Sequence, residues 1–146
     1  MIEGVIVTPL KKIEDERGAV MHMLRVDSPV FQQFGEIYFS SIKQGAVKAW
    51  KKQKSKILNY AVPFGSVHVV LFDDREQSPT HGNIEEYVLG PHQYRLLTIP
   101  PGVWTGFQGL ASDVSIVANC ASEPHQSSEA FHCRIDEPSI PYDWTS

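Results

Sequence analysis

Residues 57–73 read ILNYAVPFGSVHVVLFD, two apolar runs on either side of the turn signal Pro63-Phe64-Gly65. Side chains alternate across a strand, so the second run turns one set of residues to one face: Val67, Val69 and Leu71. The opposite face carries His68, Val70 and Phe72. Because neither face is strongly polar, this run predicts a central strand enclosed between two sheets.

Similar short runs, rich in β-branched and aromatic residues, recur on both sides of this segment. We expect strands at 5–8, 19–24, 35–41, 46–50, 57–62, 66–72, 85–90, 95–99 and 114–120. Ten prolines are spread along the chain and leave few windows for a helix of about ten residues. Such short strands, at spacings of roughly 8–12 residues, are typical of an all-β sandwich or barrel. The 146 residues predict a single domain, residues 1–146.

Two segments outside these runs have their own expectations. Residues 31–34, FQQF, fit a single helical turn. Residues 136–144, DEPSIPYDW, are proline-rich and are expected to be extended. The aromatic residues Tyr142 and Trp144 indicate that this tail is attached to the body or to a neighbouring chain.

Charge and hydropathy exclude two classes of partner. The net charge is −4, whereas a general nucleic-acid-binding domain is normally basic. No apolar run approaches the roughly 18 residues of a membrane span, and the start has no basic region or cleavage site typical of a signal peptide.

Cys120 and Cys133 form no CxxC pair, so we expect two reduced thiols in a cytoplasmic protein.

The motifs follow one another in a characteristic order: DERG (15–18), FGEIYFS (34–40), GAVKAWKKQ (45–53), VHVVLFDDR (67–75), IPPGVWTGF (99–107), IVAN (116–119) and SIPYDW (139–144). This ordered set resembles the dTDP-4-dehydrorhamnose 3,5-epimerase family of the cupin superfamily. The resemblance extends from about Gly4 to Trp144. It implies an all-β cupin jelly roll (a double-stranded β-helix barrel), a homodimer, and a nucleotide-sugar bound in the barrel mouth.

The resemblance also assigns ligand-contacting positions. Arg17 corresponds to the family's arginine that reaches ligand phosphate, often across the dimer. Lys48 stands at a phosphate-contacting arginine and keeps its charge without the bidentate fork. Gln53 matches the family's glutamine, and Glu36 and Tyr38 take the places of polar residues that contact the ligand.

Other family positions are altered. Lys51 stands where the family has its general-base histidine, and Pro124 or His125 stands where it has its catalytic tyrosine. Asp73 matches a buried family aspartate near the base. A longer C-terminal segment, which in full epimerases supplies a carboxylate to orient the histidine, has no counterpart.

The metal-binding pattern of cupins is also missing. Its outer glycines fit Gly45 and Gly65, but its ligand positions hold Lys51, Gln53, Leu58 and Thr105. These side chains do not suit a transition metal, which prefers imidazole, thiolate or carboxylate. We therefore expect neither a metal nor another cofactor.

Epimerisation beside a ketone requires a base, an acid for the opposite face and stabilisation of the enolate. If strict alternation holds, Lys51 faces the barrel interior with Ala49 and Gln53. It is then either the replacement base or an inward charge paired with Asp73 or Glu36. A base from another strand is the alternative.

Further candidates come from the strands and turns around the pocket. His68, expected in the barrel or at the sheet interface, is the alternative base, and His125 is a substitute acid. Tyr60, like Tyr38, is a candidate to polarise a keto group or stack on a sugar, with core packing as its alternative. Trp104, like Trp50, is expected to flank the pocket.

The cationic residues divide into two groups. Arg17, Lys48 and Arg75 are candidates to bind a diphosphate. Lys52, Lys54 and Lys56 are predicted to form a solvated face that guards a strand edge.

Three functions remain open. The first is epimerisation or isomerisation of a 4-keto sugar nucleotide with an altered acid–base set. The second is a catalytically inactive cupin that binds a nucleotide-sugar. The third is the same fold recruited to another small anionic ligand.

Overall fold

The segment 57–73 forms two strands that do not pair with each other. In the computed structural model, which describes residues 1–145, β6 (Leu58–Phe64) and β7 (Val67–Asp73) belong to different sheets. Between them Gly65 has a φ of +87°, and a Cβ at this residue would lie 2.2 Å from Ser115 Oγ. Glycine is required here both for the backbone conformation and for the close approach, and it carries the chain from one sheet to the other.

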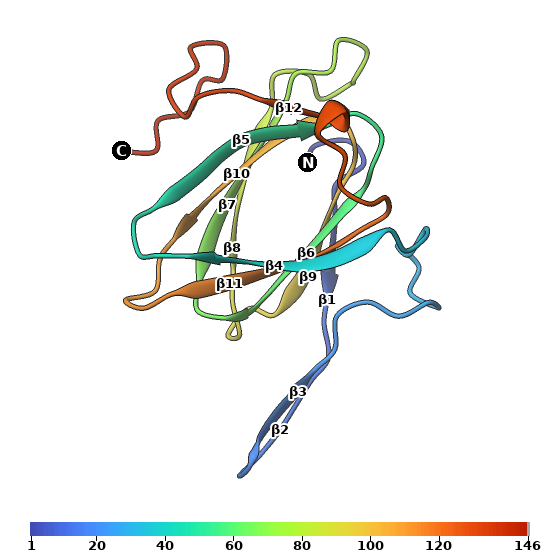
Figure 1. Ribbon diagram of the computed structural model, residues 1–146, viewed down its shortest axis with the longest axis vertical. Coiled ribbons are helices and arrows are strands. Elements are labelled where there is room, and N and C mark those ends of the chain that lie inside the picture. The colour runs from blue at the N-terminus through green and yellow to red at the C-terminus, as the bar shows by residue number, and fades with distance from the viewer. Residues whose placement is uncertain (146) are drawn as a thin grey trace.

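Two five-stranded antiparallel sheets face each other (Figure 1). The first has the order β1 (Ile6–Pro9), β9 (Arg95–Ile99), β6, β11 (Ser115–Ala121) and β4 (Glu36–Ile42). The second has the order β12 (Ala130–His132), β5 (Val47–Gln53), β10 (Val103–Gly109), β7 and β8 (Ile84–Leu89). The prediction of an all-β fold is confirmed, but β7 faces the other sheet on one side only, because the C-terminal tail covers its other side.

The remaining elements lie outside these two sheets. β2 (Lys12–Asp15) and β3 (Gly18–Met21) form a separate hairpin that projects from one end of the body (Figure 1). A 3₁₀ turn, η1 (Ser127–Glu129), precedes β12. Within residues 1–145, no helical segment has the length and apolar character needed to cross a bilayer.

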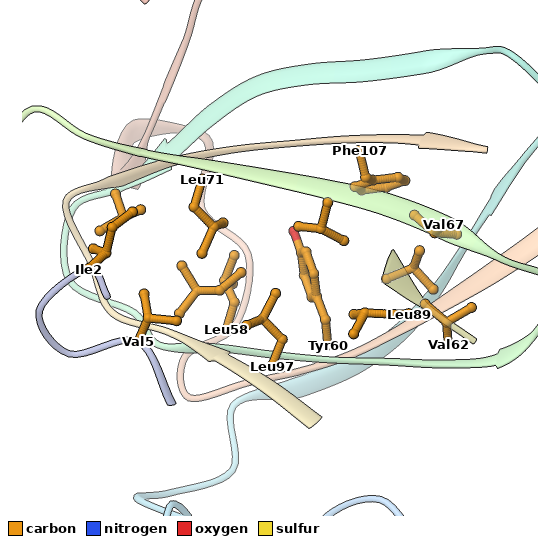
Figure 2. Close-up of a cluster of buried hydrophobic side chains, with 14 of the residues drawn as sticks. Ile2, Val5, Leu58, Tyr60, Val62, Val67, Leu71, Leu89, Leu97 and Phe107 are labelled. Carbon is orange, nitrogen blue, oxygen red and sulfur yellow. The ribbon is translucent and has the colours of Figure 1, made fainter. Parts of the chain in front are cut away.

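A hydrophobic core fills one part of the space between the sheets (Figure 2). Both sheets contribute fully buried side chains to it, among them Val62, Val67, Val69, Leu71, Leu89 and Leu97. The predicted inward face of β7 is therefore correct. Burying each such side chain contributes about 1.5–3 kcal/mol, which makes this core the main stabilising element of the barrel.

The opposite face of the second sheet is covered by the C-terminal tail. Ile140 and Trp144 are buried there, against Trp50 of β5 and Val70 and Phe72 of β7. The ring centroids of Trp50 and Trp144 lie 5.3 Å apart, and Tyr142 packs at right angles to Trp50. The prediction that the tail is extended and attached is confirmed, and its partner is the chain's own second sheet.

Gly106 makes room for the tail. This β10 residue lies beneath it, and a Cβ there would be 2.7 Å from Trp144 Cζ2 and 2.6 Å from Ala49 Cβ. Both distances are shorter than real carbon–carbon contacts, so the absence of a side chain allows Trp144 to reach the sheet.

A β-bulge in β5 changes which side chains face the interior. Opposite β10, Lys51 pairs with Thr105 and Lys48 pairs with Phe107, so three positions along β5 match two along β10. A bulge inserts one residue and resets the alternation. Lys48 and Lys51 consequently lie on the same inner face, whereas strict alternation had placed them on opposite faces.

Other local predictions were less accurate. Residues 31–34 form no helical turn, and the strands β2, β10 and β12 were not expected. Lys56 is only 4% exposed, so the prediction that it belongs to a solvated lysine face is wrong.

Candidate functional site

A cavity of about 440 Å³ occupies the part of the barrel that the hydrophobic core leaves open. The first sheet lines it with polar side chains from β4, β6 and β11: Tyr38, Ser40, Tyr60 and Asn119. The second sheet lines it with polar side chains from β5, β10 and β12: Lys48, Lys51, Thr105 and His132. A cavity of this size, apolar in part and with polar groups from two walls, suits a small organic ligand.

Lys51 is half-buried on the second wall, between Thr105 of β10 and His132 of β12. Directly opposed residues on antiparallel strands present their side chains on the same face, so the lysine and the histidine are close neighbours. Within residues 1–145, no carboxylate forms an ion pair with Lys51. The expectation that Lys51 pairs with Asp73 or Glu36 is therefore wrong, whereas the prediction that it faces the barrel interior is correct, because it lines the cavity.

Lys48 connects the two walls. Its Nζ donates to Ser40 Oγ at 2.8 Å and to the Ser41 carbonyl at 2.6 Å, both on β4. The bulge in β5 points this side chain inward. Lys48 thereby places a positive charge beside a serine hydroxyl at the cavity.

Two tyrosines approach from the first wall. Tyr60 crosses the space between the sheets (Figure 2), and burial and the neighbouring Tyr38 raise its pKa far above the usual value. Its hydroxyl therefore stays protonated and remains a hydrogen-bond donor. Tyr38 Oη accepts a hydrogen bond of 3.0 Å from Asn119 Nδ2.

Asn119 is itself held in place by the backbone. Its Oδ1 accepts a hydrogen bond of 3.2 Å from the Asn59 amide, and the side chain is 1% exposed. The first wall thus presents two phenol groups, one of which is fixed by a buried amide.

Comparison with known proteins agrees with this arrangement. The family model described as dTDP-4-dehydrorhamnose 3,5-epimerase matches residues 1–146. The chain belongs to the dTDP-4-dehydrorhamnose 3,5-epimerase family.

Two curated proteins resemble the chain along most of its length. A probable low-salt glycan biosynthesis epimerase of Haloferax volcanii is 31% identical, over 97% of this chain and 89% of that protein. The spore coat polysaccharide biosynthesis protein SpsL of Bacillus subtilis is 30% identical, over 100% of this chain and 98% of that protein.

Solved structures show the same fold. The dTDP sugar isomerase of Desulfovibrio desulfuricans G20 is 48% identical, with a TM-score of 0.96, over 99% of this chain and 92% of that one. A dTDP-6-deoxy-D-glucose-3,5-epimerase of Legionella pneumophila, in complex with dTDP-4-keto-L-rhamnose, is 22% identical with a TM-score of 0.87. That structure covers 99% of this chain with 80% of its own length, and confirms the jelly-roll fold.

Asp73, which the family resemblance placed near the base, lies in a loop-stabilising network. Asp73 does not line the cavity: its carboxylate accepts hydrogen bonds from Arg75, Ser78 and Thr80, which organise the loop between β7 and β8. Burial alone would raise the pKa of Asp73, but these hydrogen bonds lower it well below the usual range. We predicted a catalytic position, whereas the structure places Asp73 and Arg75 in a loop-stabilising ion pair.

His68 and Trp104 also lie away from the cavity. His68 Nε2 is 2.9 Å from Glu86 Oε1, on the outer face that the tail covers, so its predicted inward direction is wrong. Trp104 donates from Nε1 to Asp74 at 2.8 Å and packs with the tail cluster on the same face. Neither side chain was expected under a tail, because the strand pattern shows two faces but not what covers each of them. Trp50 also belongs to that cluster, but it is among the residues that line the cavity, so the prediction that it flanks the pocket is correct.

The other predicted residues do not line the cavity. Arg17 lies at the tip of the projecting hairpin and pairs with Asp15. His125 is exposed in the loop that follows β11, and Glu36 is the first residue of β4. Gln53 is buried at the end of β5, where its Oε1 has no hydrogen-bond partner within residues 1–145.

Sequence reasoning missed part of the lining. Ser40 follows Tyr38 by two positions on β4, and Asn119 ends the IVAN run, so alternation pointed to both. His132 and Cys133 lack such a signal, because β12 has only three residues. Within residues 1–145, no three histidine, cysteine, aspartate or glutamate side chains are grouped to bind a metal.

Proposed function

We propose that this protein is a nucleotide-sugar epimerase or isomerase that acts on a dTDP-4-keto-6-deoxyhexose with Lys51 as its base. The observation that carries the proposal is Lys51, which lines the cavity of an epimerase-family chain and has no ion-pair partner within residues 1–145. Several structurally similar proteins were solved in complex with dTDP or a dTDP-sugar, which supports the choice of substrate.

The chemistry follows from the groups on the two walls. A proton on the carbon beside the keto group is acidic enough for a positioned amine to remove it, and Lys51, which lines the cavity, is the candidate base. The negative charge that develops on the keto oxygen needs a hydrogen-bond donor in a site that excludes water. Tyr60, whose raised pKa keeps it protonated, supplies that hydrogen bond.

The diphosphate would lie at the mouth of the cavity. Lys48 already donates to a hydroxyl and a carbonyl of β4 there, and a phosphate oxygen is a stronger acceptor than either. In a homodimer, we expect the projecting hairpin to bring Arg17 to the partner's ligand. The two free cysteines favour a cytoplasmic location, because thiols stay reduced there.

The test is solvent exchange. The protein is incubated with dTDP-4-keto-6-deoxyglucose in deuterated water, and the hydrogens at C3 and C5 are followed by NMR. We expect deuterium at one or both carbons, lost in Lys51→Ala. A protein that binds the nucleotide-sugar without any exchange would contradict the proposal.

The second candidate is a catalytically inactive binder. Lysine at residue 51 and the lack of a tyrosine at residues 124 and 125 favour it, since these are the positions of the family's acid–base pair. Binding of dTDP without exchange, measured by calorimetry alongside the NMR assay, identifies this function.

A further inference from the structure

Inversion of a carbon centre requires one group that accepts a proton on one side of the carbon and one that donates a proton on the other side. A base removes the proton from one face, and an acid must return a proton to the other face of the same carbon. Lys51 can serve only the face turned to the second wall. The first wall must therefore provide the acid, if the proposed function holds.

We propose that Tyr38 is this acid. It lies on β4 and lines the first wall, and it stands across the cavity from Lys51. The chain reverses between β4 and β5, and the two strands splay apart from their connecting loop (Figure 1). Lys48 contacts Ser40 and Ser41 near that loop, so moving to Tyr38 on β4 and to Lys51 on β5 leads in the same direction.

A buried hydrogen-bond chain fixes the direction of the Tyr38 hydroxyl. The Asn59 backbone amide can only donate, so the Asn119 atom that it contacts must be the oxygen. The Asn119 nitrogen therefore faces Tyr38 and donates to its Oη. Because Oη accepts this bond, its own proton points elsewhere, and within residues 1–145 it has no acceptor.

The proton balance closes with these groups alone. The Lys51 amine takes the proton from the carbon beside the keto group, and the electron pair moves onto the keto oxygen as an enolate. The Tyr38 hydroxyl then gives its proton to the opposite face of that carbon, which restores the ketone. The phenolate regains a proton from water, and the Lys51 ammonium returns its extra proton to water.

The two steps can be separated in deuterated water with dTDP-4-keto-6-deoxyglucose as substrate. In Tyr38→Phe we expect inversion to fall at least 100-fold, the lower range for loss of a general acid. Deuterium should still enter the same carbon with its configuration retained, because Lys51 can return a solvent deuteron to the face it served. A merely structural role for Tyr38 would lower exchange and inversion together.

Asn119→Asp tests the orientation of the hydroxyl. The aspartate keeps an oxygen for the Asn59 amide but presents a second oxygen to Tyr38, so the tyrosine would donate to it and turn its proton away from the cavity. We expect the same loss of inversion with continued exchange. Tyr60→Phe is the matched control, since it removes a phenol from the same wall and should lower both rates in parallel.

The outcomes distinguish the role of Tyr38 as the acid from the proposed function of the protein. Exchange without inversion in Tyr38→Phe and Asn119→Asp supports Tyr38 as the acid. Inversion at the unchanged rate in Tyr38→Phe overturns this inference and leaves the proposed function intact. If the unaltered protein exchanges no hydrogen, the proposed function fails and this inference fails with it.

Discussion

Lys51 and Lys52 are neighbours in one strand but lie in opposite environments. Lys52 faces the outer side of the sheet, where its Nζ is 3.2 Å from Asp74 Oδ1 and 4.8 Å from the centre of the Trp104 ring. Lys51 faces the cavity and has no ion-pair partner within residues 1–145. The same type of side chain thus has two roles: Lys52 stabilises the fold on the outer face, and Lys51 is available for chemistry on the inner face.

Replacement of Lys51 should have the largest effect on activity. Lys51→Met keeps the length of the side chain and removes the amine. We expect hydrogen exchange at C3 and C5 to fall by about 10²–10⁴-fold, the usual contribution of a general base. The measurement is the NMR exchange assay, and the unfolding midpoint should be almost unchanged because no ion pair is lost. Exchange at the normal rate in this variant would show that a residue other than Lys51 is the base.

Trp144→Ala should have the largest effect on stability. It removes a buried ring from the outer face and leaves Trp50 partly uncovered. Truncation of a buried aromatic residue costs about 3–5 kcal/mol, and a tail that can collapse onto the gap should stay near the lower value. Urea unfolding measures the loss.

Trp144→Phe is the matched control. Trp144 Nε1 has no hydrogen-bond partner within residues 1–145, so phenylalanine loses volume but no hydrogen bond. A destabilisation equal to that of Trp144→Ala would show that packing is not the cause.

Lys52→Met is the counterpart of the Lys51 variant. It removes the ion pair with Asp74 and the contacts with the Trp104 and Phe131 rings. We expect a loss of about 1 kcal/mol in the free energy of unfolding, since each such contact contributes up to about that amount. Exchange at C3 and C5 should keep its normal rate, and a large loss of exchange would erase the contrast between the two faces.

Tyr142→Phe should have the smallest effect, and its size should depend on pH. Burial and a hydrogen bond to Glu86 raise the pKa of Tyr142 to about 12. Because the folded pKa lies above the unfolded value of about 10, the contribution is complete below pH 10 and is lost as pH rises through about 12. Near pH 8 the variant should lose up to about 1 kcal/mol, as for one hydrogen bond.

The pH dependence is measured by urea unfolding of both proteins between pH 8 and 12. The difference between them should shrink as the pH rises above 10. A difference that stays constant across this range would show that Tyr142 does not lose its proton more readily in the unfolded chain.

Periodicity in the sequence predicted most of the strands, but not β2, β10 and β12, and not the directions of all site residues. The alternation of Val67, Val69 and Leu71 predicted the inward face of β7 correctly. It also placed His68 on the opposite face, but only the folded tail shows that this face is covered. A tail contact depends on residues more than seventy positions away, for which a local pattern contains no signal.

The candidate site was predicted in part for the same reason. Lys51, Tyr38, Tyr60 and Lys48 line the cavity as expected, the last of them because of a bulge that alternation could not show. Thr105, Asn119 and His132 reach it from three different strands. Their convergence is set by the pairing of β10, β11 and β12, which is a property of the whole barrel.

Gly106 is a position at which almost any substitution should be poorly tolerated. Every other amino acid carries at least a Cβ, and here that one carbon would meet the bulge of β5 and the ring of Trp144 at once. Even the smallest change, to alanine, would disturb the tail and the bulged strand together through a single methyl group. In evolutionary terms, the position can vary only if the tail and the bulged strand change with it.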